Sequence, residues 1–153
     1  MGALSSNARA VEAVRYVHHD ARSSNELRAD LVEVMVTCSN NAATCCVRLR
    51  RWPEAGRHAR NALVILDALY AKRGKKIHGV LTLVGASDAK LFGEWRSKSL
   101  LIAAKASTNQ SDHDEALERS RAARRCVDEF SNHDDAPPFL ILFLAVYSLA
   151  VCR

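Results

Sequence analysis

The chain has few residues that interrupt helices. It contains only 6 glycines and 3 prolines among 153 residues, and its long stretches are rich in Ala, Leu, Arg and Glu. Those four residue types favour helix, so the composition predicts an all-α fold. The length suffices for one domain with a hydrophobic core. We therefore expect a single helical domain over residues 1–153, helical over 7–71 and 88–153, with an insertion or linker over 72–87.

Aromatic residues are also scarce, at 6% of the chain. Two basic clusters, Lys72–Lys76 and Arg119–Arg125, contain no aromatic side chains on which bases could stack. This composition disfavours a nucleic-acid partner. The net charge of +5 is mildly basic. This positive charge favours acidic partners through long-range attraction. Alternatively, it only keeps the protein soluble.

Motifs of catalysis and of metal binding are missing. We find neither a glycine-rich phosphate loop nor a nucleophile elbow. The five cysteines are odd in number and match no zinc spacing, so they fit reduced thiols of a cytoplasmic protein. We expect no enzyme, no metal and no cofactor. A helical enzyme is the alternative, and it would require that three histidine–carboxylate triplets converge in one cleft. These triplets are His18–Asp20, His113–Glu115 and His133–Asp135.

No apolar run reaches the 20 or so residues of a membrane span. The longest, Phe139–Cys152, has 14 residues (152 − 139 + 1). A helix that is apolar on all sides is buried in protein or lies in lipid. Three alternatives stay open for this segment: a packed terminal helix, a contact that forms a homodimer, or the membrane anchor of a tethered adaptor.

Helical segments alternate with short polar breaks along the chain. Ser23, Ser24 and Asn25 form one break, and Pro53 stands where a helix accepts proline, in its first turn. Residues Ile77–Gly85 could be a loop, a strand or a helix extension. With the final apolar segment, about six helices are expected: Asn7–Ala21, Glu26–Leu49, Pro53–Ala71, Asp88–Ala106, Asp112 or Asp114 to Phe130, and one from Phe139.

In the second and third of these helices, small side chains recur at positions where the two helices are expected to cross. They are Ala43, Cys46, Ala55 and Ala62, with Trp52 at the turn between the helices. A similar helix start recurs at Ala116, 61 residues after Ala55 (116 − 55). Tetratricopeptide repeats have a period of about 34 residues. We assign the excess to the segment Lys72–Ser87 and to a polar loop over Ser107–Asp112.

This pattern resembles the tetratricopeptide repeat family, most closely its co-chaperone and immunophilin-type domains. One repeat, Val36–Leu69, matches the family closely, with small residues where its two helices cross. For the later repeat two alignments are open. Trp95 could take the bulky position, followed by Ser99 and Ile102 at the small positions, or Trp95 and Arg96 could take the place of the family's aromatic–arginine pair.

The second predicted helix carries a polar stripe of residues three or four apart, namely Thr37, Asn40, Asn41, Thr44 and Arg48. The resemblance implies that this stripe faces a concave groove and hydrogen-bonds an extended peptide, with Arg96 as a basic anchor. Asn41 matches an asparagine of members that bind acidic C-terminal chaperone tails, whereas Phe92 stands where those members carry lysine. The expected function is a protein-binding scaffold or co-chaperone-like adaptor. A merely solvated polar face is the alternative.

Overall fold

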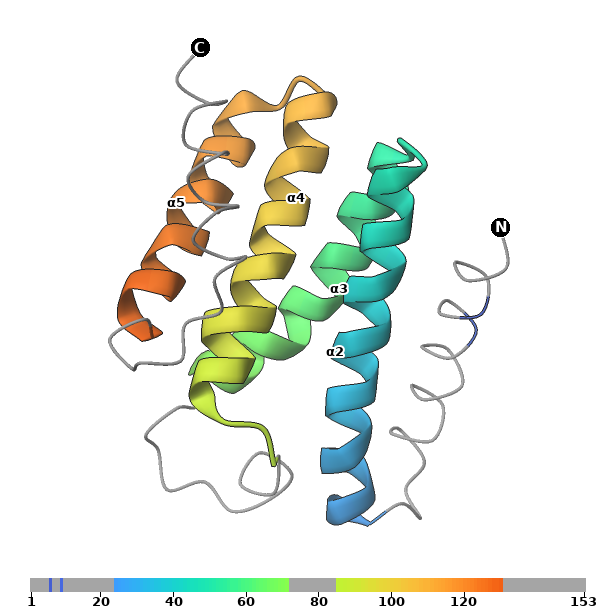
Figure 1. The fold of residues 1–153 in the computed structure, drawn as a ribbon, viewed down its shortest axis with the longest axis vertical. Coiled ribbons are helices and arrows are strands. Elements are labelled where there is room, and N and C mark those ends of the chain that lie inside the picture. The colour runs from blue at the N-terminus through green and yellow to red at the C-terminus, as the bar shows by residue number, and fades with distance from the viewer. Residues whose placement is uncertain (1–5, 7–8, 10–23, 72–84, 131–153) are drawn as a thin grey trace.

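The described part of the protein is entirely helical. The computed structural model describes residues 24–71 and 85–130, together with Ser6 and Arg9. The predicted helix from Phe139 lies outside these residues, as do nearly all of the predicted helix Asn7–Ala21, of which only Arg9 is described, and nearly all of Ile77–Gly85. The described helices follow one another without a strand, which confirms the all-α prediction for this part (Figure 1): α2 Asn25–Arg48, α3 Trp52–Ala71, the π-helix η2 Ala89–Arg96, α4 Ser97–Asn109 and α5 His113–Phe130.

Local capping residues fix the helix starts. The Ser24 hydroxyl accepts a hydrogen bond from the backbone N–H of Leu27 at 3.1 Å. The Asp112 carboxylate accepts one from the N–H of Glu115, also at 3.1 Å. These bonds satisfy N–H groups that have no partner inside the helix. For this reason the predicted starts of α2 and α5 lie within one residue of the observed ones.

The helices form two hairpins, α2–α3 and α4–α5, with the same turn. Each turn holds a residue in the left-handed conformation, Arg50 with φ 54° and Ser111 with φ 64°. In each, the next residue's N–H bonds back five residues at 2.9 Å, from Arg51 to Cys46 and from Asp112 to Ser107. This pair of features is the Schellman ending of a helix.

Because the two turns are alike, each position of the first hairpin corresponds to the position 61 residues later in the second, as Arg50 corresponds to Ser111 (111 − 50). The predicted correspondence of Ala55 with Ala116 is therefore confirmed, and both side chains are buried. The alignment that put Ser99 and Ile102 opposite Ala43 and Cys46 is wrong. The turns pair Ala43 with Ala104 and Cys46 with Ser107, five residues later than that alignment (104 − 99).

The predicted polar loop over Ser107–Asp112 is likewise wrong in extent. Helix α4 continues to Asn109, and only three residues separate it from α5. Side-chain amides near its end bond back to the preceding turn, from Asn109 to the Lys105 carbonyl and from Gln110 to that of Ala106. The extra length of the second repeat therefore precedes α4.

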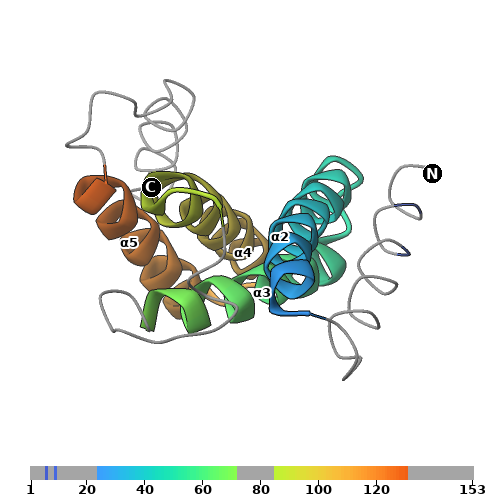
Figure 2. The same ribbon diagram turned by 90° about the horizontal axis from the view of Figure 1, so that it is seen from below.

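Small residues let α3 pack closely between α2 and α4 (Figure 2). Ala55 and Ala59 of α3 are fully buried in one hydrophobic cluster with residues of α2, α4 and α5. A Cβ atom on Gly56 would lie 3.3 Å from the Cβ atom of Ala106. The backbones of α3 and α4 therefore approach as closely as side chains allow at this point.

A second cluster joins α2, α3, η2 and the end of α5. The Phe92 ring packs edge-on to Tyr70 at 5.3 Å and tilted against Phe130 at 5.7 Å between ring centroids. Gly93 is tighter still, because a Cβ there would lie 3.0 Å from the Cβ of Phe130. Burial of these aromatic rings fixes η2 against α5.

Helices η2 and α4 form one continuous helix with a change of hydrogen-bond register. A switch from π to α register leaves a backbone carbonyl without its usual partner. Here serine hydroxyls bond to the carbonyls at the switch. Ser97 donates to Gly93 and Glu94, and Ser99 donates to Trp95 at 2.8 Å. Within the described helices, none combines the length and apolar composition of a membrane span.

Candidate functional site

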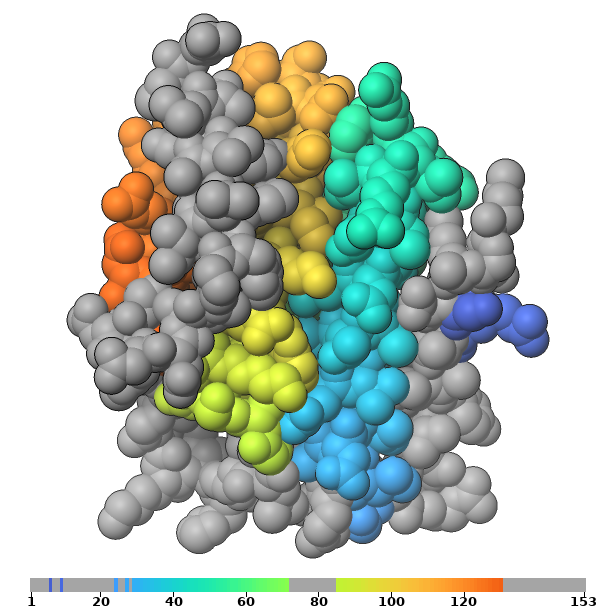
Figure 3. Space-filling model, in the orientation of Figure 1, coloured from blue at the N-terminus to red at the C-terminus, as the bar shows by residue number. Residues whose placement is uncertain are grey.

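Part of the predicted polar stripe lies exposed along α2. Thr37, Asn41 and Arg48 are exposed, and Thr44 is half-buried. The side chains of Thr37, Asn41 and Arg48 make no hydrogen bond or ion pair within the described part of the chain. Figure 3 shows α2 and α4 side by side on one face of the molecule. Among the described residues, nothing engages these three exposed side chains.

Asn40, in contrast, is turned into the protein and is only 2% exposed. Its amide oxygen accepts a hydrogen bond from the Ser99 hydroxyl at 2.7 Å, and its Nδ2 lies 3.4 Å from the Trp95 carbonyl. The Thr44 hydroxyl donates to the backbone carbonyl of Asn40 at 2.8 Å. Asn40 thus ties α2 to the helix formed by η2 and α4.

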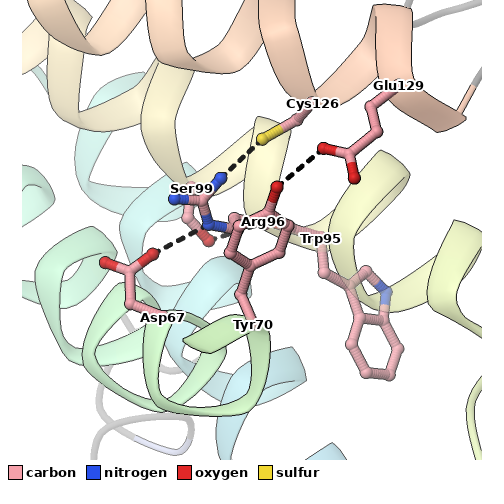
Figure 4. A network of polar contacts seen from close by, with 7 residues as sticks. All are labelled: Asp67, Tyr70, Trp95, Arg96, Ser99, Cys126 and Glu129. Carbon is pink, nitrogen blue, oxygen red and sulfur yellow. Dashed lines mark hydrogen bonds and ion pairs between the residues drawn. The ribbon is translucent and has the colours of Figure 1, made fainter. Parts of the chain in front are cut away.

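Arg96 is the centre of a polar network between α3 and α5 (Figure 4). Its Nε donates to the Asp67 carboxylate at 2.8 Å, and an Nη donates to the Cys126 sulfur at 2.7 Å. Its guanidinium carbon lies 4.8 Å from the centroid of the Tyr70 ring. The Tyr70 hydroxyl donates to Glu129 at 2.7 Å. These contacts give Arg96 a structural role, and peptide binding by Arg96 stays a prediction.

The pKa directions agree with this network. Burial lowers the pKa of Arg96, but the hydrogen bond to Asp67 and the nearby charges outweigh it, so the net shift is upward. Burial raises the pKa of the Cys126 thiol, and Arg96 opposes that shift only in part. The hydrogen bond to Glu129 raises the pKa of Tyr70. At neutral pH the network therefore holds a charged guanidinium beside a protonated thiol and a protonated phenol.

The position expected to carry lysine does not supply a positive charge. Phe92 is 2% exposed, and its ring belongs to the second hydrophobic cluster. The neighbouring Lys90 places its ammonium 5.0 Å from the centroid of the Trp95 ring, which is a cation–π contact. A clamp of the chaperone-binding kind would lack this lysine.

The one described histidine–carboxylate triplet has an ordinary structural setting. His113 and Asp114 are exposed, while Glu115 accepts hydrogen bonds from Ser107 and Arg119. The other two triplets lie outside the described residues. Among the residues that are described, no three His, Cys, Asp or Glu side chains are arranged to hold a metal ion.

Two features of this region were not anticipated from the sequence. The network around Arg96 joins residues about 30 positions apart, and no local motif announces it. Leu27 and Val34 are 41% and 42% exposed. They stand 14 and 7 residues before Asn41 (41 − 27, 41 − 34), so they extend the same face of α2. Their seven-residue spacing was a signal available in the sequence.

Comparison with known proteins found no family model, no curated protein and no solved structure that matches this chain.

Proposed function

We propose that this protein is a protein-interaction module of the tetratricopeptide type, a cytoplasmic scaffold or co-chaperone-like adaptor. In this proposal about six helices form a right-handed superhelix, of which the two described hairpins are the centre. The repeated turn and the buried small residues at equivalent positions support it. The binding surface is the outward face of α2.

The single observation that carries the proposal is the unpaired polar face of α2. Thr37 and Asn41 offer hydrogen-bonding groups to an extended peptide backbone, and Arg48 offers a positive charge at one end. Asn40 holds the helix in place from behind through Ser99 and Trp95. An acidic C-terminal segment, such as a chaperone tail, suits this face because its carboxylates pair with a guanidinium.

Titration of acidic C-terminal peptides against the protein tests the proposal. Asn41→Ala should weaken binding about 2- to 10-fold, the effect of losing one neutral hydrogen bond. Asn109→Ala is the matched control. Asn109 is also exposed, but its amide bonds only within its own helix, to Lys105. Absence of binding, or equal effects of the two substitutions, would refute the assignment of the site.

A further inference from the structure

The two hairpin turns have the same backbone but opposite charge. The α2–α3 turn and the start of α3 carry arginines, at 48, 50, 51 and 57, against the single acid Glu54. The α4–α5 turn and the start of α5 carry acids, at 112, 114, 115 and 118. Position 51 is Arg and its equivalent, position 112, is Asp. The two turns thus differ in charge although their backbone conformation is the same.

Several of these charges have no partner within the described part of the chain. Arg51 pairs with Glu54 at 2.5 Å, and Glu115 bonds to Ser107 and Arg119. Arg50, Arg57, Asp114 and Glu118 are exposed and make no ion pair there. These four charged groups are therefore available for ion pairs with another molecule as far as the described residues are concerned.

Both turns lie at the same end of the molecule, the upper end in Figures 1 and 3. Between them the first turns of α3 contact the end of α4, at Gly56 and Ala106. A two-fold axis through this end would place the basic turn of one copy against the acidic turn of the other. In a symmetric dimer each such contact occurs twice.

We propose that this end binds a second copy of the chain, as an end-to-end dimer held by the oppositely charged turns. A second copy suits the surface better than a polyanion does. A nucleic acid on the arginine turn would be repelled by the acidic turn beside it, whereas a second copy satisfies both charges.

The dimer is weak and depends on salt. Exposed ion pairs are individually weak, and a contact between helix ends falls at the small end of specific interfaces. Since exposed charges are screened over about 8–10 Å in physiological salt, association strengthens as salt is removed. This dependence distinguishes the dimer from one formed through an apolar helix.

Sedimentation equilibrium of the full chain at about 30 mM and about 500 mM salt tests the proposal. We expect the wild type to dimerise at low salt and to dissociate at high salt. Arg50→Glu with Arg57→Glu gives the end an excess of acidic groups, and Asp114→Lys with Glu118→Lys gives it an excess of basic groups. Each double variant alone should be monomeric, and an equimolar mixture of the two should form a heterodimer.

Arg121→Glu with Arg125→Glu is the control. It makes the same charge change at exposed positions of α5 that have no ion pair in the described residues, so its dimerisation should match the wild type. Circular dichroism confirms that all variants fold. A wild type that is monomeric at low salt overturns the proposal. Binding of poly(U) by that monomer would assign the basic turn to a polyanion instead. Failure of the mixed variants to associate overturns it as well. Because all variants keep Asn41 and Arg48, the peptide titration can be repeated on the monomeric variants, which separates peptide binding from dimerisation.

Discussion

Asn40 and Asn41 are neighbours in sequence but lie in opposite environments. Asn40 is buried with both ends of its amide engaged, whereas Asn41 is exposed. Removal of a buried hydrogen-bonding group leaves its partners unsatisfied, but removal of an exposed one does not. Substitution of Asn40 therefore tests stability, whereas substitution of Asn41 tests the proposed binding.

We predict that Asn40→Ala lowers the free energy of unfolding by about 1–3 kcal/mol, because the hydrogen bonds of the Asn40 amide to Ser99 and to the Trp95 carbonyl, which join α2 to η2 and α4, are lost. Asn41→Ala should change it by less than about 0.5 kcal/mol. Urea denaturation of the two variants measures both values. Equal destabilisation would show that the amide of Asn40 contributes nothing to the packing of α2 on α4.

Arg96 should not tolerate lysine. The guanidinium contacts Asp67, Cys126 and Tyr70 at once, and an ammonium cannot reproduce its planar fork. We predict that Arg96→Lys costs about 1–2 kcal/mol of unfolding free energy. Lys98→Arg, at a half-buried position of α4, is the control, because it exchanges the same two residue types in the opposite direction. It should leave the free energy of unfolding nearly unchanged. Unchanged stability in Arg96→Lys would contradict the structural role.

His58 makes stability depend on pH. It is 8% exposed, and its Nδ1 has no hydrogen-bond partner among the described residues. Burial, and then Arg57, lower the pKa of His58 below its usual value near 6.5. The unfolded chain therefore binds the proton more readily, so stability is complete above about pH 6.5 and falls as the pH drops toward the folded pKa.

The prediction is a fall in the urea midpoint of the wild type between about pH 7 and about pH 5. His58→Leu removes the titrating group at similar volume and should flatten this part of the profile. If the slope were the same in both proteins, other groups would have to account for it.

At the scale of the helices, two glycines lie at contacts that differ in how well they would accommodate a Cβ atom. A Cβ at Gly93 would meet the Cβ of Phe130 at 3.0 Å, whereas at Gly56 the nearest atom, the Cβ of Ala106, is at 3.3 Å. Alanine also gains about 1 kcal/mol over glycine in helix propensity. We predict that Gly93→Ala destabilises by about 1–3 kcal/mol and that Gly56→Ala is close to neutral. Thermal unfolding ranks the pair, and the opposite order would contradict this packing of η2.

Helix positions were predictable from the sequence because their signals are local. Ser24, Pro53 and Asp112 mark starts that the structure places within a residue of the prediction. The alignment of Ser99 and Ile102 failed because the bulky Trp95 seemed to open a repeat. Counted back from the turn at Ser111, the equivalent of Ala43 is Ala104.

The site was less predictable than the helices. The spacing of the polar stripe grouped Asn40 with Asn41, since both lie near the same side of an ideal helix. Only the contact with Ser99, 59 residues away, turns Asn40 inward. The burial of Arg96 likewise depends on Asp67 and Cys126, which no local pattern connects to it.

At the scale of the whole molecule, the two hairpins share one hydrophobic core. Leu63 of α3 is buried in a cluster with Leu101 of α4 and Cys126 of α5. Neither hairpin can lose its structure without exposing part of the other. Unfolding should therefore be a single cooperative transition in the described region.

The two tryptophans test this cooperativity, because Trp52 begins α3 and Trp95 lies in η2. Trp95→Phe leaves fluorescence from the first hairpin, and Trp52→Phe leaves fluorescence from the second. In each variant the fluorescence and the far-ultraviolet circular dichroism should give the same urea midpoint. Different midpoints for the two probes of one variant would indicate that the hairpins unfold separately.

The π-helix η2, which precedes α4, limits how the chain can change in length. A π turn closes its hydrogen bonds over one residue more than an α turn. Deleting one residue between Ala89 and Arg96 would regularise the hydrogen bonds but rotate Leu91 and Phe92 by about 100° relative to Leu100. The first two side chains belong to one hydrophobic cluster and Leu100 to the other. A single-codon deletion here would therefore be more damaging than most substitutions, although it would make the helix more regular.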